Sequence, residues 1–471
     1  MLPLSHLQLR RRQLLERLPG PALLFAGGPR ARNNPFSEYP YRADSNFLLF
    51  FSHPEPGSAA FFDPADGTVT LFLPERTMAT TVWEGGAPGF AEVQEAAGVD
   101  AVLGTARLTE HVEQLARGRS VTTVAVADDR TTDLARRVTG LPLDHHDATR
   151  IGPPELIDAL ADLRRRKPEP EIAEIRAAGA VTRDAFLRAM GETRPGVTEQ
   201  ELAGTVAGCY ARAGCSTGYT TILSVRGEVL HNHSHGNTLR AGDLVLMDSG
   251  AERPSGFGAD VTRAWPASGE FTPEQRDVYR IVLDAHQAAA EAVRPGGRWM
   301  DVHLASARVI ARGLTDLKLL KGDPDDLVAR GAHTLFYPHG VGHYLGLDTH
   351  DLRVFGDRVM YPAGRTRSTD FGTDMLRMDP DLEAGMVVTV EPGLYFIPAL
   401  IRGDDFRARF PDAVDWDRAA AYLEMNERRG FGGVRIEDDF LVTEDGRENL
   451  TPDIPKEPGE VEAAVQTAAC A

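Results

Sequence analysis

The feature that most constrains this chain is a repeat in which an apolar strand ends in a carboxylate. Residues 242–250 and 385–393 each begin with glycine, continue with strand-forming residues, and place Asp248 or Glu391 two residues before another glycine. Such runs are typical of strands buried on both faces, where an unpaired carboxylate is costly. The repeat therefore predicts a domain with two similar halves whose acids converge.

Each copy of the repeat is followed by a second strand that also carries an acid. Asp260 lies in the run 258–265, and Glu437 lies in the run 433–443. Four carboxylates on apolar strands need cations nearby, because desolvation costs several kcal/mol per ion. Carboxylates alone suit Mn²⁺, Mg²⁺ or Ca²⁺, and an added histidine favours Mn²⁺, Zn²⁺, Co²⁺ or Fe²⁺. The pattern predicts a metal site.

Six histidines are candidates for the same site, namely His231, His233, His235, His339, His343 and His350. His339 and His343 have the spacing of a helical zinc motif, but Gly340 and Gly342 oppose a helix. No glutamate follows the first histidine of that pair, which excludes the HExxH motif. We expect these imidazoles to line a cleft from a glycine-rich loop.

Length, charge and cysteine content exclude several classes of protein. A chain of 471 residues exceeds one ordinary core, so at least two domains are expected. The net charge of −18 argues against a nucleic-acid partner. No run approaches the roughly 20 apolar residues of a membrane span. Three cysteines without a CxxC pair argue against a disulfide framework and favour the cytoplasm.

The chain divides into two regions at the polar segment 145–154, which holds two prolines and a glycine. Residues 1–150 predict a small α/β domain with a mixed or parallel sheet, and residues 151–471 predict a larger one. In the first domain we expect strands at 22–26, 46–51, 59–63, 68–73 and 121–127 and helices at 7–18 and 131–138. In the second we expect helices at 171–190, 199–213, 273–293 and 301–313.

The four acidic strands and the histidine loop together resemble the pita-bread metallopeptidases, and within them the Xaa-Pro aminopeptidases and Xaa-Pro dipeptidases. Segment 37–47 also resembles the N-terminal domain of bacterial aminopeptidase P. The resemblance implies an α+β protein with a creatinase/aminopeptidase-like catalytic domain of duplicated halves in residues 151–471. It implies that the smaller domain, residues 1–150, serves oligomerisation and closure of the cleft.

The resemblance implies five ligands for two divalent metal ions, which are Asp248, Asp260, His343, Glu391 and Glu437. Asp260 and Glu437 would bridge the ions, and Asp248 would complete one of the two coordination shells. His343 and Glu391 would complete the other. Mn²⁺ is favoured, with Zn²⁺ or Co²⁺ as alternatives, and a water shared by two cations would have a pKa near neutrality.

The resemblance also implies roles for residues around the metals. Glu391 would accept and shuttle the proton, and His231 and His350 would contact the scissile carbonyl and its oxyanion. Other matched residues are His339 beside the proline ring, and Arg435 and Tyr395 behind the ligands. Thr349 departs from the family signature, which has valine or isoleucine there, and this difference is conservative in size and branching.

The predicted reaction is cleavage of an Xaa-Pro bond, a tertiary amide without the N–H that ordinary proteases require. Xaa-Pro aminopeptidase is favoured, and Xaa-Pro dipeptidase is the alternative. Arg377, fourteen residues before Glu391, would bind the carboxylate of a dipeptide or would instead pair with Asp374 or Asp379. The inserted segment 394–429 would cap the cleft or serve a subunit contact.

Expected partners are proline-containing peptides and further copies of the chain, in a homodimer or homotetramer to which Trp83 is a candidate contact. Two other functions remain as minor alternatives. One is a metal-free pita-bread binding protein, which the complete set of five ligands opposes. The other is methionine aminopeptidase, which usually lacks so long an N-terminal domain.

Overall fold

The computed structural model describes residues 2–34, 36–52 and 54–467, so Cys470 lies outside the described part. The chain forms two compact units. The first comprises Met1–Glu174, Pro254–Gly256 and Leu352–Val359, and the second comprises Ile175–Arg253, Phe257–Asp351 and Met360–Ala471. Residue 150, where the sequence predicted the boundary, lies inside the first unit.

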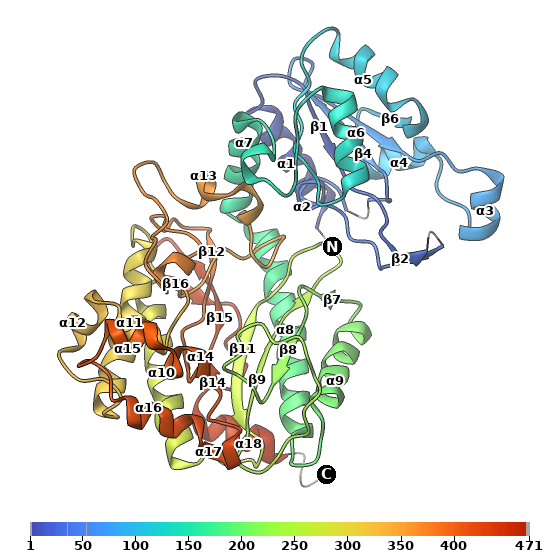
Figure 1. Cartoon of the computed structure of the whole chain (residues 1–471). Coiled ribbons are helices and arrows are strands. Elements are labelled where there is room, and N and C mark those ends of the chain that lie inside the picture. Colours follow the sequence, from blue (N-terminus) through green and yellow to red (C-terminus); the bar gives the residue numbers. More distant parts are fainter. Residues whose placement is uncertain (1, 35, 53, 468–471) are drawn as a thin grey trace. The chain divides into compact units, whose positions relative to one another are not determined.

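The first unit is built on a four-stranded mixed sheet with helices around it (Figure 1). The strand order is β1 (Ala22–Phe25), β4 (Ala59–Asp63), β5 (Thr68–Leu73) and β6 (Ala101–Gly104). Only the β5–β6 pair is parallel. The remaining elements are β2 (Ala31–Asn34), β3 (Ser37–Glu38), α1 (Leu4–Leu15), α2 (Ser45–Leu48), α3 (Met78–Glu84), α4 (Phe90–Ala97), α5 (Leu108–Ala116), α6 (Asp129–Thr139) and α7 (Pro154–Arg165).

Two strand predictions for this unit were wrong. Residues 46–51 begin within helix α2, because the Asp44 carboxylate accepts a hydrogen bond from the Asn46 backbone N–H and caps the first turn. The apolar run is buried all round, so its periodicity could not distinguish helix from strand. Residues 121–127 reduce to a single parallel bridge between Thr122 and Ala22.

The second unit contains the four long helices that the sequence predicted, which are α8 (Glu169–Glu192), α9 (Glu199–Arg212), α10 (Pro273–Ala292) and α11 (Trp299–Asp316). Helix α8 begins just before the division between the units. The shorter helices of this unit are α12 (Pro324–Ala329), α14 (Pro398–Arg402), α15 (Asp404–Arg409), α16 (Trp416–Leu423), α17 (Met425–Arg428) and α18 (Pro458–Gln466). Helix α13 (Asp357–Met360) belongs to the first unit except for its last residue. None of the helices in the described part is long and apolar enough to cross a membrane.

The strands of the second unit confirm the duplicated arrangement. The first half has the order β11 (Val261–Pro266), β9 (Leu244–Ser249) and β8 (Ile222–Ser224), all antiparallel. The second half has the order β12 (Val387–Val390), β15 (Asp438–Val442) and β16 (Arg447–Asn449), also antiparallel. Two small antiparallel pairs complete the strands, β7 (Ser216–Thr217) with β10 (Ala251–Glu252) and β13 (Gly393–Tyr395) with β14 (Gly433–Arg435).

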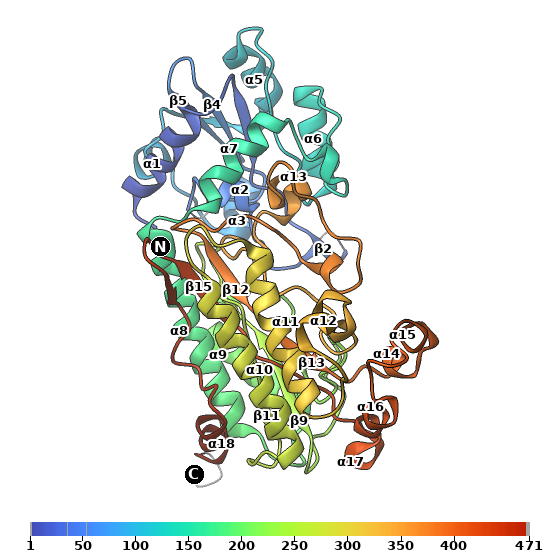
Figure 2. The same ribbon diagram turned by 90° about the vertical axis from the view of Figure 1, so that its left-hand side faces the viewer.

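Each half is accompanied by its own pair of helices. Helix α9 packs on β8, whereas α10 packs on β12, β13 and β14. Figure 2 shows α10 and α11 running side by side along the second half. The halves meet at an isolated antiparallel bridge between Thr262 and Glu437. Each half thereby presents its acidic strand to the other, as the repeat predicted.

The inserted segment 394–429 belongs to the core of the second unit. It includes the last two residues of β13 and then forms helices α14 to α17. The rings of Phe396 and Tyr422 stack with centroids 4.1 Å apart, and Phe431 lies against both. Ile401 and Phe410 of the same segment are buried in the same hydrophobic cluster. Packing alone therefore accounts for the apolar residues of this segment.

Candidate metal centre

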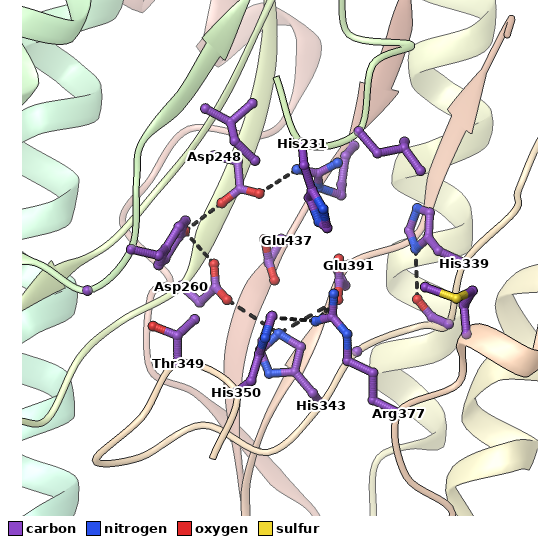
Figure 3. A pocket seen from close by; sticks show the side chains of 18 of the residues that line it. His231, Asp248, Asp260, His339, His343, Thr349, His350, Arg377, Glu391 and Glu437 are labelled. Atoms are coloured by element: carbon purple, nitrogen blue, oxygen red, sulfur yellow. Dashed lines mark hydrogen bonds and ion pairs between the residues drawn. The ribbon is translucent and has the colours of Figure 1, made fainter. Parts of the chain in front are cut away.

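A cleft of about 560 Å³ in the second unit contains all five predicted metal ligands (Figure 3). The strands bring the ligands together from separate parts of the chain. Asp248 lies within β9, and Asp260 directly precedes β11. Glu391 follows β12, and Glu437 lies between β14 and β15. The remaining predicted residues of the lining are His231, His339, His350, Arg377 and Arg435.

The ligand atoms lie at separations that one ion can span. Oxygen and nitrogen atoms of Asp260, His343 and Glu437 all lie within 4.8 Å of one another, and all three side chains are buried. His343 Nε2 lies 3.4 Å from Oδ2 of Asp260 and 3.8 Å from Oε1 of Glu391. Asp248 is connected to the same group through Tyr219, which bonds both Asp248 and Asp260.

The tautomer of His343 also fits a metal ligand. Its Nδ1 lies 2.9 Å from the carbonyl of Tyr344 and donates to it. A neutral imidazole carries only one N–H, so Nε2, which faces Asp260 and Glu391, is the nitrogen that offers its lone pair. A backbone carbonyl that holds the other nitrogen is the arrangement found at protein metal sites.

The carboxylates are crowded and poorly compensated by protein cations. Burial, followed by the neighbouring carboxylates, raises the pKa of Asp260 and of Glu437 well above their ordinary values. Burial also raises the pKa of Glu391, although Arg377 and Arg435 oppose the shift. These two arginines are the only cationic side chains other than histidine in the described lining. The donor set therefore fits divalent cations, which would stabilise the ionised carboxylates.

A network of side-chain hydrogen bonds around Arg435 contacts the predicted ligands. Arg435 donates from Nε to the Thr262 hydroxyl at 3.0 Å, and that hydroxyl donates to Oε2 of Glu437 at 2.7 Å. Another nitrogen of Arg435 bonds Oδ2 of Asp248. The Tyr395 hydroxyl lies 3.1 Å from Nη1 of Arg435. Arg435 thus contacts Asp248 directly and Glu437 through Thr262, and Tyr395 lies behind Arg435.

Tyr219 is a residue of the site that the sequence analysis missed. It lies in the loop between β7 and β8, and its hydroxyl contacts Oδ1 of both Asp248 and Asp260. Burial, followed by those two carboxylates, raises the pKa of Tyr219 well above its ordinary value, so the hydroxyl keeps its proton. A single tyrosine in a loop belongs to no periodic pattern, so the sequence does not show which side chains it will contact. The folded positions of β7 and β8, which flank the loop, place Tyr219 beside the two acids.

The histidines of the cleft differ in their surroundings. His339 donates from Nδ1 to the Gly340 carbonyl at 2.8 Å, so its Nε2 accepts from the Tyr395 hydroxyl at 2.9 Å. Burial, followed by the charge of Arg435, lowers the pKa of His339 to about 3. His231 is more exposed, and desolvation followed by Arg377 and Arg435 lowers its pKa. His233 lines the cleft, whereas His235 contacts the Thr221 carbonyl at 3.2 Å.

Arg377 points into the cleft and contacts catalytic candidates. Its Nη1 lies 2.6 Å from Nε2 of His350 and 3.7 Å from Oε1 of Glu391. Of the two acids that the sequence offered as alternative partners, Asp379 is held by Arg298 through both of its oxygens. The described lining of the cleft includes no residue of the inserted segment 394–429. Arg377 therefore lies beside two of the predicted catalytic residues, His350 and Glu391.

Comparison with known proteins identifies relatives over the whole chain. Residues 173–444 match the metallopeptidase family M24, and residues 7–125 match the aminopeptidase P N-terminal domain. Xaa-Pro aminopeptidase of Escherichia coli K12 is 34% identical over 472 residues, which cover 98% of this chain and 97% of the relative. Human Xaa-Pro dipeptidase is 31% identical and covers 98% of this chain and 94% of the relative.

Solved structures give the same result for the fold. Aminopeptidase PepP of Pseudomonas aeruginosa matches with a TM-score of 0.81 at 31% identity, covering 100% of this chain and 99% of that one. Aminopeptidase P from E. coli with the inhibitor Pro-Leu also matches with a TM-score of 0.81, at 32% identity and with coverage of 100% and 99%. The fold of both units is thus shared with these structures.

Proposed function

The chain belongs to metallopeptidase family M24, and we propose from this premise that it is an Xaa-Pro aminopeptidase, an enzyme that removes the N-terminal residue preceding proline. The observation that carries the proposal is the cleft in which all five ligands converge. The match of residues 7–125 to the aminopeptidase P N-terminal domain favours this activity over others of the family. The complete ligand set opposes a metal-free binding protein.

We propose two divalent ions at Asp248, Asp260, His343, Glu391 and Glu437, with Mn²⁺ favoured and Zn²⁺ or Co²⁺ as alternatives. Four carboxylates and one imidazole suit these metals. When bound, such ions polarise the scissile carbonyl and lower the pKa of water. That chemistry explains why a bond without an N–H donor can be cleaved here.

The protein's own groups would bind the peptide and move the proton. Glu391, at the edge of the ligand cluster, would accept a proton from the attacking water and deliver it to the leaving proline nitrogen. His231 and His350 would donate to the carbonyl oxygen as negative charge develops there. His339, held neutral beside Tyr337 with ring centroids 5.0 Å apart, would contact the proline ring.

Peptide length distinguishes the proposed activity from the dipeptidase alternative. We expect hydrolysis of Ala-Pro, of Ala-Pro-Ala and of longer peptides with the same start, measured as the release of free alanine. Turnover of the dipeptide alone would overturn the choice of aminopeptidase. Segment 394–429 contributes no residue to the described lining of the cleft, which supports an enzyme that accepts longer peptides.

Arg377 is the specific observation that favours the dipeptidase. It lies in the cleft beside His350, where a guanidinium could bind the carboxylate of a bound dipeptide. If it does so, Arg377→Ala raises KM for Ala-Pro at least about 10-fold while KM for longer peptides changes little. Arg402→Ala, on an exposed arginine of α14, is the control. An equal effect on all substrates would exclude this role.

We further propose that the enzyme is a cytoplasmic homodimer or homotetramer and that the first unit provides the subunit contact. Helix α3 exposes three large apolar side chains, Met78, Val82 and Trp83, with 79%, 70% and 87% of their surface accessible. Such a patch is typical of an interaction surface. Sedimentation of Trp83→Arg beside the unaltered chain tests this, because an unchanged oligomer would exclude Trp83 from the contact.

A further inference from the structure

The bridge that joins the two halves of the second unit has two sides with different chemistry. Successive residues of an extended segment point to opposite faces, so Thr262 and Glu437 share one side, and Arg263 and Asp438 share the other. We call the first side the ligand face and the second side the ion-pair face. On the ligand face the Thr262 hydroxyl bonds the Glu437 carboxylate.

Arg263 on the ion-pair face uses every donor that a guanidinium possesses. The side chain is fully buried, and each of its five N–H groups meets an acceptor. The acceptors are the backbone carbonyls of Thr262, Glu437, Ile454 and Pro455 and the Asp438 carboxylate. Nη1 lies 2.9 Å from the Thr262 carbonyl and 2.6 Å from the Glu437 carbonyl. One nitrogen therefore holds both residues of the bridge.

The Asp438 carboxylate keeps the guanidinium in this position. Its Oδ1 lies 2.6 Å from Nη2 of Arg263. Its other oxygen accepts from the side-chain amide of Asn449 at 3.0 Å and from the Lys456 ammonium. The carboxylate is thus anchored by β16 and by the segment that follows it, independently of Arg263. An anchored anion limits the rotamers that the arginine can adopt.

The bridge joins β11 of the first half to a residue between β14 and β15 of the second half. The bridge between Thr262 and Glu437 is isolated, and the Glu437 N–H donates to the Thr262 carbonyl at 3.0 Å. Asp260 lies only two residues from this bridge, so a shift at the bridge moves Asp260 relative to Glu437. These are the two carboxylates proposed to bridge the metal ions. Side-chain contacts add to the backbone bond here: the Asp260 N–H donates to the Asp439 carboxylate at 3.1 Å, and Arg263 holds the Thr262 and Glu437 carbonyls on the opposite face.

We propose that Arg263 is a positioning residue for the metal centre, which clamps the Thr262–Glu437 bridge and so sets the spacing of the Asp260 and Glu437 carboxylates. The inference rests on the proposed metal-dependent function. Lysine at this position would keep the charge and the ion pair, but its three N–H groups cannot replace five that diverge in one plane. The geometry of the bridge, and not the charge alone, is the property that Arg263 controls.

Titration of metal-free protein with Mn²⁺, with free Mn²⁺ followed by electron paramagnetic resonance, tests this inference. In Arg263→Lys we expect the Kd for Mn²⁺ to rise by about 10- to 100-fold, as for other residues that orient metal ligands. At saturating Mn²⁺ we expect kcat to stay within about 3-fold of the unaltered enzyme, because the ligands and catalytic groups are all present. Asp438→Asn should give a smaller rise in Kd.

The matched control is Trp265→Phe. Trp265 is fully buried on the same strand, β11, and its indole N–H donates to the Thr193 hydroxyl at 2.9 Å. Its loss should lower the melting temperature of the metal-free protein without changing the Kd for Mn²⁺. A purely structural role for Arg263 would give the same result as this control.

The outcomes separate the inference from the proposed function. A Kd that is unchanged in both Arg263→Lys and Asp438→Asn, or that rises equally in Trp265→Phe, overturns the clamp. If Arg263→Lys does not fold, Asp438→Asn and Trp265→Phe alone decide by the same comparison. An unaltered chain that binds no Mn²⁺, Zn²⁺ or Co²⁺ overturns the proposed function itself, and the inference with it.

Discussion

Glu437 and Asp438 are consecutive acids on the two faces of one bridge, and both are buried. Burial, followed by Asp260 and Glu391, raises the pKa of Glu437 well above its ordinary value. Burial acts in the same sense on Asp438, yet Arg263 and Lys456 outweigh it and hold the pKa of Asp438 below its ordinary value. Burial is thus common to both acids, and the supply of protein cations differs. A buried carboxylate cluster with too few protein cations to outweigh burial is the one that fits a metal site.

The largest expected effect is the difference in activity between variants of Glu437 and Asp438. Glu437→Gln should lower kcat/KM for Ala-Pro-Ala by on the order of 10³-fold, because a carboxylate of the proposed metal site is lost. Asp438→Asn at saturating Mn²⁺ should stay within about 10-fold, while its free energy of unfolding falls by about 3 kcal/mol as a buried ion pair is weakened. Peptide hydrolysis and urea unfolding measure the two quantities. Similar losses of activity in both variants would remove the distinction between the faces.

A second prediction concerns the Tyr219 hydroxyl, which contacts two of the proposed ligands. Tyr219→Phe should raise the Kd for Mn²⁺ by about 10- to 100-fold, because Asp248 and Asp260 lose their shared donor. The matched control is Tyr210→Phe, since the Tyr210 hydroxyl is also buried and bonds Ser249 at 2.9 Å but contacts no ligand. Calorimetric titration measures both values. A Kd that changes alike in the two variants would show a general effect of lost hydroxyls.

Added Mn²⁺ should stabilise the folded protein through the acids of the ligand face and independently of Asp438. At a free Mn²⁺ concentration of 100 times Kd, linkage predicts about 2.7 kcal/mol of added stability, and the melting temperature should rise by a few degrees. Asp438→Asn should show nearly the same rise in melting temperature when free Mn²⁺ is 100 times the Kd of that variant. Glu437→Gln should show a much smaller rise. Differential scanning calorimetry with and without Mn²⁺ measures this. A full rise in Glu437→Gln would mean that the metal binds elsewhere.

The smallest expected effect is a loss of stability at low pH from two buried histidines, His303 and His333, that lie on neither the ligand face nor the ion-pair face. Burial lowers the pKa of His303 to about 3 and the pKa of His333 to about 4. Both rings are neutral in the folded chain but titrate near 6.5 when unfolded, so their contribution is complete above about pH 6.5 and is lost as pH falls. At pH 5 each costs roughly 2 kcal/mol of stability by this linkage.

This acid sensitivity can be measured by melting temperature between pH 7 and pH 5. In His303→Phe the fall in melting temperature over that range should be smaller than in the unaltered chain by a few degrees. His233→Ala, which removes an exposed histidine, should follow the unaltered chain. A parallel fall in all three proteins would show that His303 is not the group that titrates.

The sequence indicated the acids of the cleft better than it indicated the side chains that contact them. An acid in an apolar strand is conspicuous in the sequence, because its burial needs compensation, and this located Asp248, Asp260, Glu391 and Glu437. Tyr219 had no such signal, since nothing in a loop sequence shows which carboxylates a hydroxyl will meet. Arg263 did have one, a charged residue within the apolar strand 261–266. Its role, however, depends on carbonyls more than 170 residues away.

Helices and strands were also predicted well where a local sequence pattern decides them, and poorly where other contacts do. Helices with strong periodicity, such as 273–293, were predicted almost to their ends. Residues 46–51 were wrong, because a run that is apolar on every side has no periodicity, and the cap at Asp44 decided the structure. The length of peptide accepted depends on the shape of the cleft around Arg377, which no local pattern contains.

The isolated bridge between Thr262 and Glu437 has a consequence for biosynthesis. The first half of the second unit carries two of the five proposed ligands, Asp248 and Asp260, and the other three lie within residues 343–437. A ribosome must therefore complete nearly the whole chain before a full coordination shell can exist. On the proposed ligand set, a polypeptide that stops before residue 437 would lack part of the metal site, so metal uptake would report that both halves have folded and joined.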